Sequence, residues 1–347
     1  MFLVTNKPVP ILYLSVIKGI FLTVLLGLSI SSIRAQEGYP LYTEYLSGNP
    51  YIAHPSMAGD RLAGFRIKTS LRKQWLEQID APNQQTMSLE YSASAHSKLA
   101  LILFSDQNGY HKSTGFYATY AHHISFQDVT WNTKRTFPTK NDQLKELYFG
   151  ISIGSIQNNI NTSSFNFSSQ DPVLGQAMEA NSYLNADVGM SFITTKFRVS
   201  ITLKNLMSSP LILNDELAGP EASPEYFRRL LVGLGYTFYN TSNWAFEPSV
   251  LYQTFELSGE QVFDYNLKLY RYLRQGRAWL GISYRNDFIG AGSSTENINE
   301  RTTLKWITPL IGLDYKNILF AYNYANTRGN VRFSNSGIHQ VTLGFSF

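Results

Sequence analysis

Histidines are the residues of this chain best suited to hold a metal ion, but their spacing does not support a metal site. His122 and His123 are adjacent, and neighbouring side chains on a strand point to opposite faces, so the pair cannot close on one ion. The other four are scattered without the spacing of metal ligands: His54, His96, His111 and His339. Cysteine is absent, so thiolate sites and disulfides are ruled out. The sequence therefore predicts no metal and no cofactor.

Catalytic residue patterns are also missing from the sequence. We find no nucleophile elbow, no phosphate-binding glycine loop and no pair of acids in a recognisable frame. A catalytic triad is defined by geometry, so a barrel wall could in principle carry one without a sequence signature. The prediction is nevertheless that the protein is not an enzyme.

The charge balance argues against nucleic acid as a partner. Of the 29 basic residues, Lys7, Lys18 and Arg34 lie in residues 1–35, a stretch without acids, which leaves 26 basic residues against 25 acidic ones. The high isoelectric point therefore comes largely from the amino-terminal stretch and does not indicate a basic binding surface.

The elements that position the polar residues are strands. From Val341 to Phe347 every odd position is apolar and every even position is small or polar. This alternation is the pattern of a strand with one apolar and one polar face. It recurs along the chain and predicts about fourteen strands, near residues 64–72, 85–94, 98–106, 114–126, 146–157, 183–194, 196–205, 227–239, 243–254, 263–272, 277–287, 303–313, 316–326 and 337–347.

Two classes of all-β protein fit this alternation. A soluble β-sandwich would bury the apolar faces, whereas a transmembrane antiparallel β-barrel would turn them towards lipid. The barrel is favoured by the terminal Phe347, by small or charged residues on the other face, and by tight turns that alternate with long polar stretches. The 22 Tyr and 22 Phe residues are enough to form aromatic girdles at both membrane interfaces.

The amino-terminus predicts export. Lys7 and Lys18 precede a short apolar run at 20–30, followed by a small residue, Ala35, which is the pattern of a secretory signal peptide cleaved near Ala35. The run falls short of the ~20 residues that a membrane-spanning helix needs. We therefore expect three parts and an outer-membrane location: a signal peptide (1–35), a plug or periplasmic segment (36–60) and the barrel (61–347).

Residues 42–59 carry a resemblance to a known family. They include Tyr42, Asn49-Pro50 and the stretch His54-Pro55-Ser56-Met57-Ala58-Gly59, and resemble the opening of the PorP/SprF family of Bacteroidetes outer-membrane proteins. His54 and Ser56 depart from the Asn and Ala that this family favours. The resemblance continues in order through Arg72-Lys73-Gln74-Trp75, Tyr120-Ala121-His122-His123, Asn185-Ala186-Asp187-Val188-Gly189, Glu247-Pro248-Ser249-Val250-Leu251-Tyr252 and Trp279-Leu280-Gly281-Ile282-Ser283-Tyr284-Arg285.

The resemblance implies a non-enzymatic component of the type IX secretion and gliding machinery. Its partners would be a secreted surface protein such as an adhesin, bound through the type IX carboxy-terminal domain, periplasmic or outer-membrane type IX components, and outer-membrane lipid. The alternative function is a passive porin or small-solute transporter, because a lumen with charged residues could conduct. A barrel of about fourteen strands is narrower than the open porins, which favours the secretion component.

The residues that match the family are the candidate site, and they could serve in docking a partner or in sealing the barrel: Asn49, Pro50, Pro55, Ala58, Gly59, Arg72, Gln74 and Trp75. Arg72 is expected to face the lumen and to pair with Glu90 or Glu247. Trp75 is expected in an aromatic belt at the membrane interface. Pro248 lies inside a predicted strand, where a bulge or a local opening is expected.

Overall fold

A computed structural model of the chain describes ten stretches of residues: 43–77, 81–109, 111–126, 144–160, 181–207, 228–240, 243–256, 261–288, 305–328 and 337–347. The expected signal peptide, with its cleavage near Ala35, lies outside these stretches. So do residues 36–42 and most of the long polar stretches between predicted strands. In the described part of the chain, no helix is both long and apolar enough to cross a membrane.

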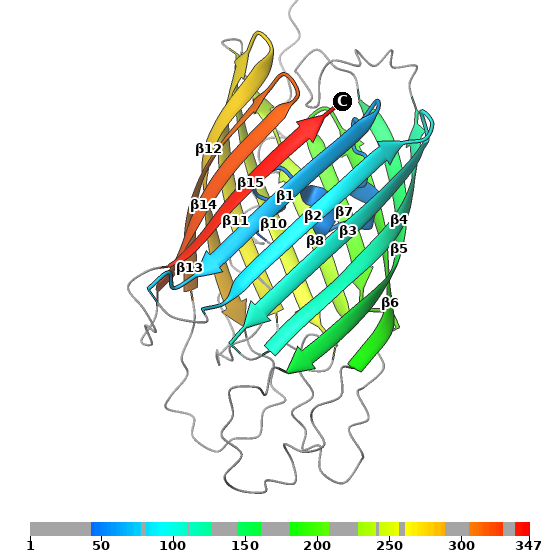
Figure 1. Ribbon diagram of the computed structural model, residues 1–347. Coiled ribbons are helices and arrows are strands. Elements are labelled where there is room, and N and C mark those ends of the chain that lie inside the picture. The colour runs from blue at the N-terminus through cyan, green and yellow to red at the C-terminus, as the bar shows by residue number, and fades with distance from the viewer. Residues whose placement is uncertain are drawn as a thin grey trace, which may run out of the picture.

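The alternating segments form the strands of one antiparallel barrel (Figure 1). Each strand pairs with its neighbours in the chain, and β15 pairs with β1 to close the sheet. The short strands β8 and β9 pair with β10 in the same register, so fourteen strands cross the wall, as predicted. The strands are β1 (Phe65–Gln74), β2 (Asn83–Ser92), β3 (Ser97–Asn108), β4 (His111–Ser125), β5 (Lys145–Ile160), β6 (Asn181–Thr194), β7 (Phe197–Lys204), β8 (Arg229–Tyr236), β9 (Phe238–Tyr239), β10 (Trp244–Phe255), β11 (Gln261–Leu273), β12 (Gly276–Phe288), β13 (Lys305–Tyr315), β14 (Ile318–Arg328) and β15 (Ile338–Ser346).

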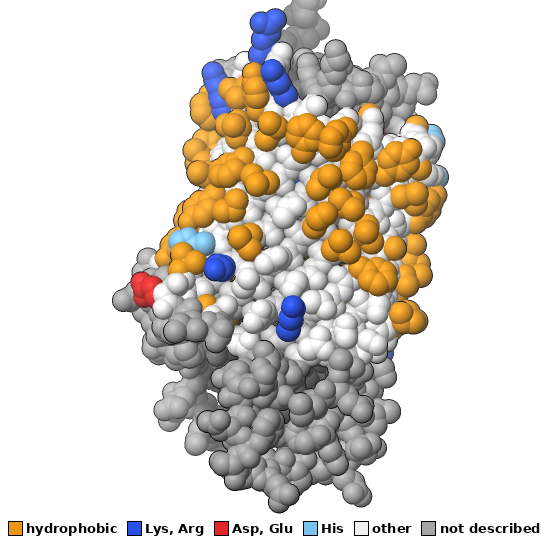
Figure 2. Space-filling view, viewed as in Figure 1, with side chains coloured by type: hydrophobic (Ala, Val, Ile, Leu, Met, Phe, Trp, Pro, Cys, Tyr) orange, Lys and Arg blue, Asp and Glu red, His pale blue; other side chains and the backbone are white. Residues whose placement is uncertain are grey.

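Burial along the strands distinguishes a membrane barrel from a soluble sandwich. Apolar side chains such as Leu280 and Leu343 are 56% and 54% exposed on the outer surface. Figure 2 shows hydrophobic side chains gathered over the outer face of the strands. Polar and charged residues at the alternate positions, such as Arg66 and Glu90 of neighbouring strands, are buried in the lumen. This inverted distribution is what lipid requires of a β-barrel.

The two ends of the barrel differ. Connections of a few residues join β2 to β3, β6 to β7, β11 to β12 and β13 to β14 at the end where Phe347 lies, the upper end in Figure 1. We call this the turn end; it also holds one longer connection, between β4 and β5. Long connections, such as those between β5 and β6 and between β7 and β8, dominate the opposite end, which we call the loop end.

Pro248 interrupts the wall without forming a bulge. On one side it pairs in continuous register with Leu267 of β11. On the other side the ladder breaks between β8 and β9, and the register is the same before and after the break. Of the two expected alternatives, a bulge or a local opening, the structure has a local opening of the ladder, because proline lacks the N–H that a ladder bond needs. Pro309 of β13 coincides with a similar gap towards β14.

The lumen is occupied by the chain that precedes β1. Residues 43–62, here called the inner segment, run inside the barrel through two short 3-10 helices, η1 (Pro50–Ile52) and η2 (Pro55–Met57) (Figure 1). Side chains from η1 pack with Ala58 against Ile102 of β3 and Ala121 of β4 in a small apolar cluster. The division of the chain at residue 60 remains a prediction.

Candidate functional site

The family-motif prolines begin the two helices of the inner segment. Pro50 and Pro55 are each the first helical residue, where proline lacks only an N–H that would have no partner in the helix. Asn49 precedes η1 and is 2% exposed. Its Nδ2 donates to Ser88 Oγ at 3.0 Å, so its side chain binds the wall rather than capping the helix.

Glycines on neighbouring strands make room for η2. A Cβ built on Gly150 of β5 would lie 2.3 Å from the carbonyl carbon of Pro55, and one on Gly189 would lie 3.3 Å from its Cδ. A Cβ on Gly233 of β8 would lie 3.2 Å from Nε2 of His54. A larger residue at Gly150 would therefore overlap the inner segment. Because these three glycines have no side chains, His54 and Pro55 can lie directly against the wall.

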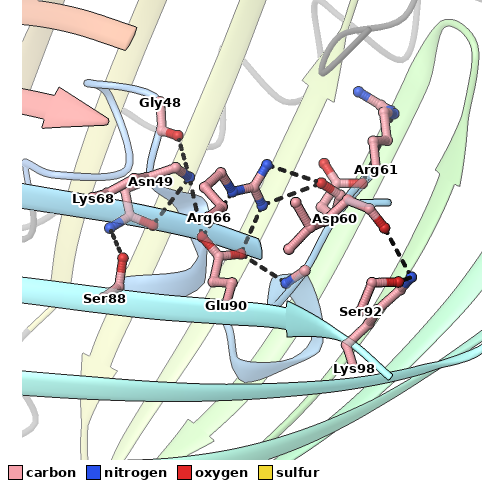
Figure 3. Close-up of polar contacts among 12 residues, drawn as sticks. Gly48, Asn49, Asp60, Arg61, Arg66, Lys68, Ser88, Glu90, Ser92 and Lys98 are labelled. Atoms are coloured by element: carbon pink, nitrogen blue, oxygen red, sulfur yellow. Dashed lines mark hydrogen bonds and ion pairs between the residues drawn. The ribbon is translucent and has the colours of Figure 1, made fainter. Parts of the chain in front are cut away.

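A buried charged cluster joins the end of the inner segment to the first two strands (Figure 3). Glu90 of β2 accepts from Arg66 Nη2 of β1 at 2.6 Å and lies 3.5 Å from Lys68 Nζ. It also accepts from the backbone N–H of Gly59 at 2.7 Å. Gly59 has φ +65°, a left-handed conformation that favours glycine, and a Cβ there would lie 2.9 Å from Lys98. Charge-assisted bonds of this length are strong, so the cluster fixes Gly59 against the wall.

Further polar contacts tie the inner segment to strands around the lumen. They differ from the Glu90 cluster in that most join neutral groups at hydrogen-bond distance. They are Tyr51 Oη to Thr119 Oγ1 at 2.6 Å, His54 Nδ1 with Thr202 Oγ1 at 2.8 Å, Ser56 Oγ with Ser191 Oγ at 2.7 Å, Asn323 Nδ2 to Ser47 Oγ at 3.0 Å, Lys268 Nζ to Leu46 O at 2.8 Å, and Thr43 with Gln340. The segment thus contacts β4, β6, β7, β11, β14 and β15 as well as the Glu90 cluster.

Burial controls protonation within the inner segment. It lowers the pKa of His54 to about 3, and the nearby charges of Lys204 and Arg198 act in the same direction. His54 is therefore neutral at physiological pH and serves as a hydrogen-bonding partner of Thr202. Burial raises the pKa of Glu44, and the charge of Arg72 opposes that shift.

The remaining candidate residues lie at the loop end of β1. Arg72 is 4% exposed and faces the lumen, as predicted, but its two expected partners are engaged elsewhere. Glu90 bonds Arg66, and Glu247 pairs with Arg198 at 3.4 Å. Gln74 ends β1, and its N–H donates to Pro82 O at 2.9 Å. Trp75 follows with φ +46°, half-buried, and its place in an interface belt stays a prediction.

The sequence indicated charged lumen residues such as Lys204 and Arg285, but not the residues with which they pair across neighbouring strands. Arg285 of β12 binds Asp264 of β11 at 2.5 and 2.7 Å, and Lys204 of β7 binds Asp187 of β6 at 3.1 Å. All four residues occupy polar positions of alternating strands, so the sequence indicates that they face the lumen. It does not give the register of the strands, which decides which charge lies opposite which.

Histidine positions agree with the expected geometry of a strand. His123 is buried and stacks on Tyr148 of β5, with ring centroids 3.6 Å apart, while His122 contacts Tyr120 on the exposed side. Among the described residues, no group of three or more His, Asp or Glu side chains could hold a metal ion.

The fold and the lumen together define a class of protein. A closed antiparallel barrel with an apolar outer surface, a charged lumen and most of its short turns at one end is a β-barrel of the outer membrane.

Comparison with known families then identifies the group to which the chain belongs. Residues 34–345 match the model of the type IX secretion system membrane protein PorP/SprF, and the chain is a member of that family. The resemblance of residues 42–59 to this family is thereby confirmed. Comparison with curated proteins finds no match.

Solved structures similar to the chain include two other barrels. The translocator domain of the autotransporter NalP from Neisseria meningitidis is 14% identical, with 88% of this chain and 96% of that chain covered and a TM-score of 0.39. The CymD monoaromatic hydrocarbon channel is 11% identical, with 86% and 92% covered and a TM-score of 0.47.

Proposed function

We propose that this protein is a non-enzymatic partner of secreted proteins in the type IX secretion and gliding machinery. It would bind the carboxy-terminal region of an exported surface protein and anchor it or help its export. Membership of the PorP/SprF family supports the link to type IX secretion. The observation that carries the proposal is the inner segment, which runs inside the barrel and is hydrogen-bonded to strands around the lumen.

The proposed orientation follows from the two ends of the barrel. Outer-membrane barrels carry short turns on the periplasmic side and longer loops outside. The turn end would then face the periplasm and meet periplasmic type IX components, while the loop end would meet the exported protein at the surface. Export of the chain itself would use the amino-terminal signal peptide, cleaved near Ala35.

The porin alternative predicts a continuous aqueous path, which the occupied lumen does not favour. Contacts of the inner segment extend from Gln340, near the loop end of β15, to Lys98, near the turn end of β3. Several polar residues of the wall that could line a channel, such as Thr202, Lys268 and Asp264, are instead bonded to the inner segment or to a neighbouring strand.

Deleting the gene in its source organism tests the proposal. We expect a specific exported protein to disappear from the cell surface, as measured by mass spectrometry of surface-labelled proteins, and to return on complementation. An unchanged surface proteome would refute the proposal. Purification of the tagged protein from native outer membranes in mild detergent would then identify the bound partner.

A further inference from the structure

A cavity of ≈ 170 Å³ lies between the inner segment and the wall. Its floor includes Leu46, Pro50 and Met57 of the inner segment. Its sides reach the turn between β6 and β7, and Asn317 in the turn between β13 and β14, so it lies towards the turn end. One buried water molecule needs ~10–15 Å³ of such space, so the cavity is large enough for a small ionic group with a short stem.

Basic residues outnumber acidic ones around this cavity. Its lining includes Arg61, Arg66, Lys68, Lys196, Arg198, Lys268 and Arg277, but only the acids Asp60, Glu247 and Asp314. Glu90, behind the lining, engages Arg66 and Lys68. Lys196 is exposed and the Arg198 side chain is 40% exposed, but Arg66, Lys68 and Lys268 are buried. Buried positive charge is costly unless an anion compensates it.

The ion pairs within the cavity are long. Arg198 lies 3.4 Å from Glu247, and Arg61 lies 3.8 Å from Asp60. The pair of Arg66 and Glu90, at 2.6 Å, is shorter although Arg66 also lines the cavity, and the pair of Arg285 and Asp264, outside the cavity, is 2.5 Å apart. Bonds between a guanidinium and a carboxylate are normally about 2.7–2.9 Å. The hydrogen bond from Arg198 to Glu247 is therefore long, and Arg61 lies beyond hydrogen-bonding distance of Asp60.

Arg61 is the clearest sign of a binding site. Its side chain is 9% exposed, and its Nε atom has no hydrogen-bond partner among the described residues. Its backbone φ is +51°, a conformation rare for a residue with a side chain. Figure 3 shows its guanidinium pointing away from the Arg66–Glu90 cluster, and the side chain lines the cavity.

We propose that this cavity binds an oxyanion, a carboxylate or phosphate group, which enters from the turn end and is held by Arg61 and Arg198. A guanidinium presents a planar fork of donors that matches either group in bidentate fashion. Tyr239 and Tyr272 line the same cavity, with ring centroids 6.2 Å apart, and give the entering group a partly apolar flank. This site is independent of the proposed secretory role, because binding requires only the barrel itself.

Calorimetric titration of the purified full-length protein tests the site. Inorganic phosphate and succinate are the two probes, at low and at high sodium chloride concentration. We expect at least one probe to bind, more weakly at high salt, because ions screen the attraction. The tighter of the two identifies the preferred oxyanion. Arg61→Gln should weaken its binding at least tenfold, whereas Arg271→Gln, an exposed arginine on β11, should leave it unchanged.

Two results would overturn the proposal: neither probe binds to the natural protein, or Arg61→Gln binds as tightly as the natural protein. Folding of each variant is checked by circular dichroism. If Arg61→Gln does not fold, Arg198→Gln replaces it with the same expectation, since the second guanidinium is 40% exposed and its replacement perturbs packing less.

Discussion

Gly150 of β5 stands directly opposite Gly189 of β6, and Pro55 of the inner segment packs over both. The two glycines leave a flat patch on the inner wall, on which η2 rests. Ser56 then reaches Ser191 of β6 at 2.7 Å, so the patch and the hydrogen bond hold the same turn of the chain. The space left by the two glycines and the hydrogen bond of Ser56 thus together determine the position of the inner segment.

The Gly150→Ala substitution should destabilise the folded barrel by displacing η2. Its Cβ would lie 2.3 Å from the backbone of Pro55, and overpacking of a filled interior costs ~1–3 kcal/mol. The free energy of unfolding is measured by denaturant titration in detergent. The matched control is Gly235→Ala of β8, whose Cβ would meet its nearest neighbour at 3.4 Å, an ordinary contact. Equal stability of both variants would show that η2 does not press on this patch.

Removing the charge of Glu90 should be far more costly than removing a surface carboxylate. Glu90→Gln leaves Arg66 and Lys68 buried without their counter-charge, and loss of one partner of a buried pair costs ~3–5 kcal/mol. Glu256→Gln is the control, because Glu256 is 53% exposed and pairs with Arg228 at 2.9 Å on the surface. Exposed pairs contribute ~0–1 kcal/mol. Denaturant midpoints that fall by the same amount would contradict the role of the Glu90 cluster.

Acid should weaken the barrel partly through His54. Burial lowers its pKa from the usual value near 6.5 to about 3, so the unfolded chain binds a proton more readily than the folded one. Stability from this residue is therefore complete above about pH 6.5 and declines as the pH falls towards 3, by ~1.4 kcal/mol per pH unit. The prediction is that His54→Gln loses less stability than the natural protein between pH 6.5 and 4.5.

The natural protein and the His54→Gln variant both keep the other buried histidine, His123. Its contribution to the pH dependence therefore cancels, and the difference between the two stability profiles reports His54 alone. Parallel profiles across this range would mean that His54 is not held neutral in the lumen.

The sequence was enough to predict the strands but not their contacts. Alternation identified every long strand, because in a barrel each residue faces either lipid or lumen, and Val341–Phe347 shows this without exception. The pairing of Arg72 with Glu90 was wrong because register is not visible in a single strand. Arg66 is the residue opposite Glu90, and Arg72 stands opposite Gln84.

The inner segment shows a similar division. Residues 36–60 were expected to form a plug or periplasmic segment before the barrel, and the described part of that stretch, 43–60, is indeed outside the sheet. The contact of the inner segment with Gly150 could not be predicted, because it depends on which strand of the closed barrel faces η2. Arg61 was missed because a lone arginine just before a strand carries no sequence signal.

Electrical conductance in planar lipid bilayers tests the central claim, that the inner segment fills the lumen, most directly. The purified natural protein should insert and leave the bilayer electrically sealed, while a variant lacking residues 43–59 serves as the open comparison. A sealed bilayer with demonstrated insertion supports the filled barrel of a secretion partner. A steady ohmic current through the natural protein would contradict the account and favour the porin alternative.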